Sequence, residues 1–266
     1  MRRTPPRRAS APSMRSMQPE LARTFLDMGA EYERYRPGFP DDAVAVFAPE
    51  RLGDVLDLGA GTGKLTRKLV PLADRVVAVD PSEPMLDQLR MILPAVDVRV
   101  GTAEDIPAPD RSQDLVTVAQ AFHWFDESLA CAEIARVLRP GGALALLWNT
   151  YDPECAWDRA CARVLHPGWT EQISERTLPP AMSPLPGFLP VTSAWIPWSE
   201  RITRDDYLAR WMTVSTARAA DEDTRADMLS RLEEILDHDP GTRGRTDLDL
   251  HQGTEVYVYR HDTGIA

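Results

Sequence analysis

VLDLGAGTGKL, Val55 to Leu65, joins an apolar run to three closely spaced glycines. The apolar residues before Gly59 indicate a buried strand, and the residues after Gly63 continue with helical spacing. Gly59, Gly61 and Gly63 lack a Cβ, so the backbone there can turn sharply and approach a ligand closely. A strand, a tight glycine loop and a helix N-terminus predict a nucleotide-type binding site at the carboxyl edge of a parallel sheet.

The size and charge of the chain limit the class of protein. Its 266 residues suit one large domain, and its 43% hydrophobic content is enough for a core. The net charge of −11 argues against nucleic acid as the main partner, and no apolar run approaches the roughly 20 residues of a membrane span. Cys131, Cys155 and Cys161 form no CxxC pair, which predicts reduced thiols in a cytoplasmic protein without a metal site.

Five apolar strands alternate with helices up to Trp148. This rhythm predicts βαβ units with right-handed crossovers, and hence a mostly parallel α/β sheet with helices on both faces. The strands are expected at residues 55–58, 75–80, 96–100, 114–118 and 143–148, and the helices between them at 64–72, 84–91 and 126–138.

The two ends of the chain follow different patterns. Residues 1–17 are rich in Arg, Pro and Ser and are expected to form a flexible tail, with one domain over 18–266. A helical pattern runs from Pro19 to Arg36, and a second helix is expected up to Phe47. After Trp148 we expect a helix within 152–165, irregular proline-rich chain at 178–190, a strand at 191–198, helices at 204–215 and 221–237, and a last strand at 254–260.

The glycine spacing and two acidic residues narrow the chemical class of the ligand. The G-x-G-x-G spacing differs from the dinucleotide fingerprint G-x-G-x-x-G and from a phosphate-binding P-loop. Asp57, inside the approach to the turn, suits a cationic ligand better than a pyrophosphate. Asp80 ends the second strand, where an acid can accept hydrogen bonds from both ribose hydroxyls, or can instead cap the next helix. Ribose is common to NAD and S-adenosylmethionine, so Asp80 alone does not choose between them.

Three aromatic residues and a histidine follow the fourth strand in AQAFHWFD, Ala119 to Asp126. At the carboxyl end of a strand they can line a small-molecule pocket or hold a cation against their ring faces. The alternative is that Phe122 and Phe125 belong to the core and that His123 is a buried imidazole with its hydrogen bonds satisfied.

The chain resembles the class I S-adenosylmethionine-dependent methyltransferases in VLDLGAGTGKL, VVAVDPSEPML and GTAEDIP. YERYRPGFP and AQAFHWFD resemble the small-molecule branch that includes trans-aconitate methyltransferase. The likeness covers residues 25–149 well and continues weakly through 195–216 and the last strand. It implies a Rossmann-like seven-stranded sheet whose last strand is antiparallel, with S-adenosyl-L-methionine as cofactor.

The resemblance also implies roles for single residues. Tyr32 and Arg36 would close over the site from the N-terminal helix, and many relatives carry an aspartate where Thr102 stands. The implied cofactor-binding positions are Tyr32 and Arg36 from the N-terminal helix, Asp57, Gly59, Ala60, Gly61 and Gly63 for the methionine part, Asp80 and Pro81 for the ribose, Met85, Thr102, Ala103 and Glu104 for the adenine, and Ala119 and Gln120 close to the methionine group.

Methyl transfer from a sulfonium is an in-line displacement for which the protein supplies position and electrostatics. A carboxylate acceptor needs no base, whereas a hydroxyl or amine acceptor can need one. His123 is the candidate base, with Trp124 beside it in the catalytic cluster. The N-terminal helix and the insertion 151–190 are expected to form a lid over the acceptor, although 151–190 could equally be a plain connector.

Other readings stay open. A nicotinamide-dependent oxidoreductase is disfavoured by the glycine spacing and by the late HWF cluster. A protein that binds the cofactor on this scaffold without transferring a methyl group would carry the same glycines and the same Asp80. The sequence names no acceptor among carboxylates, hydroxyls, amines and carbon, and it leaves a monomer and a homodimer equally open.

Overall fold

A seven-stranded sheet forms the centre of the computed structural model, which describes residues 29–166 and 182–262. The strand order is β3-β2-β1-β4-β5-β7-β6. Strands β1 to β5 are mutually parallel, and β7 runs antiparallel to both β5 and β6, so the prediction of a mostly parallel sheet with an antiparallel last strand is confirmed. The strands are β1 Leu52–Leu58, β2 Ala73–Asp80, β3 Asp97–Val100, β4 Gln113–Ala119, β5 Leu138–Tyr151, β6 Phe188–Thr203 and β7 Asp247–His261.

Helices cover both faces of the sheet. On one face, α6 buries Ile134 and Val137 against the strands. On the other face, α3 buries Val44 beside Leu69. Side chains cap two of the helices that pack on the sheet: Ser82 accepts a hydrogen bond from Met85 N, and Asp126 accepts one from Leu129 N. The helices that pack on the sheet are α3 Asp41–Ala45, α4 Thr66–Leu69, α5 Glu83–Ile92 and α6 Glu127–Val137, and α2 Gly29–Tyr35 packs on α5.

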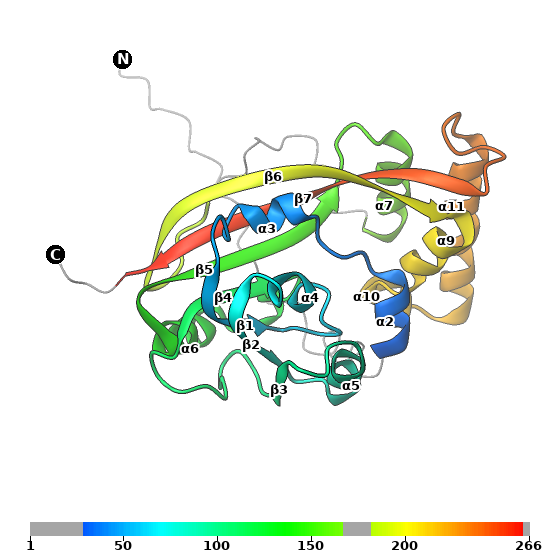
Figure 1. The fold of residues 1–266 in the computed structure, drawn as a ribbon. Helices are drawn as coiled ribbons and strands as arrows, with labels where there is room; N and C mark the ends of the chain where they lie inside the picture. The colour runs from blue at the N-terminus through cyan, green and yellow to red at the C-terminus, as the bar shows by residue number, and fades with distance from the viewer. Residues whose placement is uncertain (1–28, 167–181, 263–266) are drawn as a thin grey trace, which may run out of the picture.

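A helical cluster lies at one end of the molecule, where β6 and β7 continue past the other strands (Figure 1). It consists of α7 Ala156–Leu165, α9 Arg204–Met212, α10 Ser215–Ala219 and α11 Glu222–His238. These helices share a core of their own that contains Leu165, Tyr207, Trp211 and Leu232. Helix α2 lies beside the cluster, because Arg210 Nε of α9 donates to Tyr35 O over 2.7 Å.

The last two strands are longer than their sequence predicts. β6 begins at Phe188, so residues 188–190 form regular strand, although Pro190 and the prolines before it predicted irregular chain. β6 lies at the edge of the sheet, where proline is tolerated, and its register shifts between Pro190 and Thr192. The added end of β6 is mostly polar, and the added start of β7 alternates polar residues with only two buried leucines, Leu248 and Leu250.

Some predictions fall outside the described residues or need small corrections. The tail 1–17 and the start of the helix predicted from Pro19 lie outside them. Helix α4 spans only Thr66–Leu69, because the left-handed backbone at Gly63 delays its start. The helix predicted at 204–215 ends at Met212, and α10 follows as a separate turn of helix. Within the described residues, no helix is long and apolar enough to cross a membrane.

Candidate functional site

The glycine loop follows β1 at the carboxyl edge of the sheet. Gly59, Gly61 and Gly63 have φ values of +70°, +55° and +85°, a conformation that favours glycine. Gly59 N donates to Val79 O over 2.8 Å, which fixes the loop beside the end of β2. A Cβ on Gly59 would lie 2.6 Å from Ala121 Cβ, so only glycine lets the loop approach the chain after β4 this closely.

Asp80 ties the end of β2 to this loop. Its Oδ2 accepts from Gly61 N over 2.9 Å and its Oδ1 accepts from Ser82 N over 2.8 Å. Ser82, rather than Asp80, caps the next helix. Burial raises the pKa of Asp80, and the two backbone hydrogen bonds only partly oppose this shift. The carboxylate therefore stands at the mouth of the loop with lone pairs beyond those that the backbone uses.

Asp57 lies beneath the loop and not at its mouth. Its Oδ2 accepts from Thr66 Oγ1 over 2.6 Å and its Oδ1 accepts from Thr117 Oγ1 over 2.9 Å. Its side chain is almost fully buried, and burial raises its pKa to about 6 against the effect of the two hydroxyls. The structure thus places Asp57 as a brace between β1, α4 and β4. Thr117 lies 60 residues away in sequence, so only the fold reveals this pairing.

The other predicted cofactor positions differ in burial and in their contacts. Met85 is buried, and its Sδ lies 3.5 Å from the place of a Cβ on Gly61. Gln120 has φ +58°, and its Nε2 donates to Asn149 O over 3.3 Å. Glu104 Oε1 accepts from Asp126 N, which joins the chain after β3 to α6. Of the remaining positions, Ala60 and Ala103 are buried, Ala119 is half-buried, and Pro81 and Thr102 are exposed.

Helix α2 is fastened to the glycine loop through Glu33, which the sequence analysis missed. Glu33 Oε2 accepts from Thr62 Oγ1 over 2.7 Å, and Glu33 Oε1 accepts from Arg67 Nη2 over 2.7 Å. Burial acts to raise the pKa of Glu33, but hydrogen bonds from Thr62 and Arg67 and the charges of Lys64 and Arg67 outweigh it, so the pKa is lowered. The sequence offered one signal for Glu33, which is its position beside Tyr32 in the YERYRP motif.

Tyr32 and Arg36 lie one helical turn apart, and the guanidinium carbon of Arg36 is 5.6 Å from the centre of the Tyr32 ring. Burial raises the pKa of Tyr32, the charge of Arg36 lowers it, and the charge of Asp80 raises it, so α2 brings Tyr32 close to the end of β2. Burial lowers the pKa of Arg36, whose Nη2 donates to Thr213 O over 3.1 Å. The structure therefore joins α2 both to the sheet edge and to the helical cluster.

His123 is held as a neutral ring after β4. Burial lowers its pKa to about 4. Trp148 Nε1 donates to His123 Nδ1 over 3.5 Å, which places the imidazole proton on Nε2. In this state His123 offers a hydrogen-bond donor and not a ready base. Its ring centre lies 4.8 Å from the Trp124 ring, whereas Phe122 is buried in the core, as the alternative reading expected.

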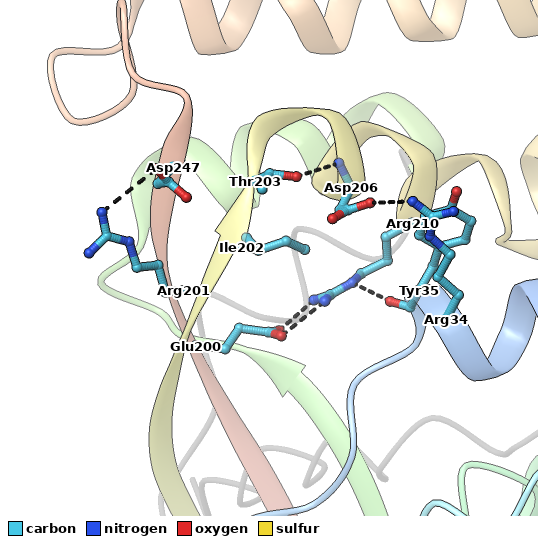
Figure 2. A pocket seen from close by; sticks show the side chains of 9 residues that line it. All are labelled: Arg34, Tyr35, Glu200, Arg201, Ile202, Thr203, Asp206, Arg210 and Asp247. Carbon is cyan, nitrogen blue, oxygen red and sulfur yellow. Dashed lines mark hydrogen bonds and ion pairs between the residues drawn. The ribbon is translucent and has the colours of Figure 1, made fainter.

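A separate recess of about 390 Å³ lies where α2 meets α9, β6 and β7 (Figure 2). Its charged residues already pair with one another: Arg210 with Glu200, and Arg34 with Asp206 at 3.5 Å. None of the predicted site residues lines it. We therefore do not assign the recess to the cofactor. Among the described residues, no group of His, Cys, Asp or Glu could hold a metal ion.

Comparisons with known proteins agree with this geometry. Residues 56–146 match the family model of a methyltransferase domain. An uncharacterized methyltransferase of Mycobacterium tuberculosis is 37% identical over 231 residues, 87% of this chain and 93% of that protein. An uncharacterized methyltransferase of Schizosaccharomyces pombe is 31% identical over 242 residues, 89% of this chain and 96% of that protein.

A solved structure described as a candidate type II methyltransferase, from Anaeromyxobacter dehalogenans, has a TM-score of 0.63 at 27% identity and covers 86% of this chain and 98% of its own. The class I resemblance is thereby confirmed, while the finer likeness to trans-aconitate methyltransferase stays a prediction. The glycine loop, Asp80 and the strand order together with these relatives show that the chain belongs to the S-adenosylmethionine-dependent methyltransferases.

Proposed function

We propose that this enzyme transfers the methyl group of S-adenosylmethionine to a small-molecule acceptor by in-line displacement. The observation that carries the proposal is the carboxylate of Asp80, held by Gly61 N and Ser82 N beside a loop of three left-handed glycines. Each carboxylate oxygen retains a lone pair for a ribose hydroxyl. The cofactor supplies an electrophilic methyl group on a sulfonium, and the protein's task is to orient the acceptor toward it.

The arrangement of elements supports a small acceptor. Helix α2 lies against the glycine loop through Glu33 and against the helical cluster through Arg36 and Arg210. An acceptor must therefore fit beside α2, which favours a small molecule over a nucleic-acid duplex. The net charge of −11 favours the same conclusion.

His123 would orient the acceptor and not deprotonate it. A neutral imidazole whose Nδ1 is used by Trp148 can donate from Nε2 to an acceptor oxygen. The base role inferred from sequence would require the ring to accept a proton with a pKa of about 4, which is unfavourable near neutral pH.

Binding of S-adenosylhomocysteine tests the cofactor site. Asp80→Ala removes both carboxylate oxygens from the ribose hydroxyls, and we expect affinity to fall roughly 10- to 100-fold by calorimetry. Asp74→Ala, an exposed acid at the far end of the same strand, is the matched control and retains the affinity. Wild-type protein that binds NADH and not S-adenosylhomocysteine would contradict the proposal.

Transfer itself needs a second measurement. Incubation with methyl-labelled cofactor and a panel of small acids, phenols and amines is expected to label at least one of them. Tight cofactor binding with no labelled product across the panel would favour the alternative, a binding protein on a methyltransferase scaffold.

A further inference from the structure

Arg36 is a buried cation for which the described residues provide no carboxylate. Its Nη2 donates to the backbone of Thr213, and its Nε is buried without a hydrogen bond. The neighbouring Arg210 differs, because both of its terminal nitrogens donate to Glu200. Burying a guanidinium without an anion is unfavourable. The arrangement is therefore incomplete until an anion arrives from outside.

A second unused donor lies in the same corner. Trp211 is only 5% exposed, and its Nε1 is buried without an acceptor. Trp211 precedes Thr213, the Arg36 contact, at the end of α9. Its ring stacks with that of Tyr151 at 5.9 Å and 13°, and lies 6.4 Å from that of His166. Both Tyr151 and His166 lie close enough to Arg36 for its charge to affect their pKa values.

Within residues 29–166 and 182–262, no anionic side chain pairs with Arg36. Burial lowers the pKa of His166 to about 4, and the charge of Arg36 lowers it further, so the ring is neutral. Burial raises the pKa of Tyr151, which keeps its hydroxyl protonated. The nearest carboxyl group on α7, Asp158, accepts a hydrogen bond from Tyr207 Oη over 2.6 Å. Among the described groups around Arg36, the uncompensated charge is positive.

We propose that Arg36 and Trp211 bind a carboxylate of the methyl acceptor, an inference that rests on the methyl transfer proposed above. A guanidinium and an indole N–H are matched donors for two carboxylate oxygens. The charge of Asp80 acts on Tyr32, and the guanidinium carbon of Arg36 lies 5.6 Å from the Tyr32 ring while its Nη2 donates to Thr213 O. The anion site thus lies between the end of β2 and the helical cluster. The stacked rings of Tyr151 and Trp211 offer a flat apolar surface to the rest of the acceptor.

Nuclear magnetic resonance of the tryptophan indole N–H groups tests this site. The protein, labelled with ¹⁵N-indole tryptophan and saturated with S-adenosylhomocysteine, is titrated with benzoate. We expect the Trp211 signal, assigned with Trp211→Phe, to move in a saturable way. Trp195 and Trp198 are internal controls, because their indoles already donate to Thr150 and Thr254. Benzyl alcohol, similar in size and uncharged, should leave the Trp211 signal in place, and equal shifts with both ligands would contradict a carboxylate site.

Variants of Arg36 test whether its guanidinium binds the carboxylate of benzoate. Arg36→Met should weaken benzoate binding at least 10-fold and leave the affinity for S-adenosylhomocysteine within about twofold. Arg34→Met, on the same helix but exposed, is the matched control and should change neither. If Arg36→Met does not fold, Trp211→Phe takes its place. It should likewise weaken benzoate binding and leave the affinity for S-adenosylhomocysteine nearly unchanged.

Three outcomes would overturn the inference. Benzoate fails to bind the wild-type complex; or Arg36→Met leaves benzoate binding unchanged; or Arg36→Met weakens S-adenosylhomocysteine but not 5′-methylthioadenosine, which lacks the amino-acid part. The last result would assign Arg36 to the cofactor's own carboxylate. Failure of the wild-type protein to bind S-adenosylhomocysteine would instead refute the proposed function, so the two failures are distinguishable.

Discussion

Asp57 and Asp80 are two buried carboxylates at the ends of neighbouring strands, and the structure uses them differently. Asp80 accepts only backbone N–H groups at the loop mouth, whereas both Asp57 oxygens bind threonine hydroxyls below it. The resemblance implies a cofactor role for both acids, and for Asp57 that role stays a prediction. A motif fixes residue order and not the direction of a side chain, and the two hydroxyl contacts show that Asp57 joins β1 to α4 and β4.

The hydroxyl of Thr117 is expected to matter only when Asp57 is ionised. Burial raises the folded pKa of Asp57 to about 6, above its unfolded value, so its contribution to stability is full below the unfolded pKa and is lost as pH rises through about 6. The hydroxyl stabilises the ionised form and so limits that loss. Thr117→Val should lower the free energy of unfolding by about 2 kcal/mol at pH 8 and by clearly less at pH 5. Urea unfolding at both values measures this.

Thr117→Ser keeps the hydroxyl and serves as the control for this prediction. A loss of the same size at pH 5 and pH 8 in Thr117→Val would show that the hydroxyl does not act through the ionised form of Asp57.

At the scale of elements, α2 depends on its neighbours for its position. A helix of seven residues is not stable alone, so tertiary contacts must hold it. Glu33 joins it to the glycine loop, and Gly29 allows close packing on α5, because a Cβ there would lie 2.5 Å from Pro84 O. Helix α2 thus links the cofactor loop to the helical cluster.

Loss of the Glu33 contacts should release α2 from the loop. We expect Glu33→Ala to weaken S-adenosylhomocysteine about 10-fold in calorimetry, because the bonds to Thr62 and Arg67 are both lost. Glu33→Gln, which can keep the Thr62 bond, should lose less. Glu31→Ala is the control, since Glu31 is exposed and its side chain pairs with Arg218 on α10. Unchanged affinity in Glu33→Ala would mean that α2 does not contribute to the cofactor site.

At the scale of the molecule, the sequence predicts the sheet better than the site. Strands such as β1 and β4 are apolar and buried on both faces, so their residues alone reveal them. The distal part of β6, Ser199 to Arg201, is polar and carries no such pattern. Site contacts such as Glu33 to Thr62 join positions far apart in the chain, so local periodicity does not encode them.

Gly253 stands where the sheet narrows from three strands to the β6–β7 ribbon that leads to the helical cluster. It pairs with Thr150, the last residue but one of β5, and with Pro197 of β6. A Cβ at Gly253 would lie 2.0 Å from Trp195 Nε1, so only glycine lets this indole lie across β7 and donate to Thr150 Oγ1. The path of the ribbon out of the sheet therefore depends on this one position.

Gly253→Ala should force Trp195 aside and lower the free energy of unfolding by roughly 1–3 kcal/mol. Cofactor affinity should change little, because the glycine loop lies across the sheet on β1, whereas turnover of an acceptor should fall as the helical cluster moves. Urea unfolding, calorimetry and the methyl-transfer assay separate these effects. Gly38→Ala, where a Cβ would meet nothing within 4 Å, is the control for stability. Equal losses of affinity and turnover in Gly253→Ala would mean that the ribbon and the cofactor loop move as one body, and that the cluster does not position the acceptor independently.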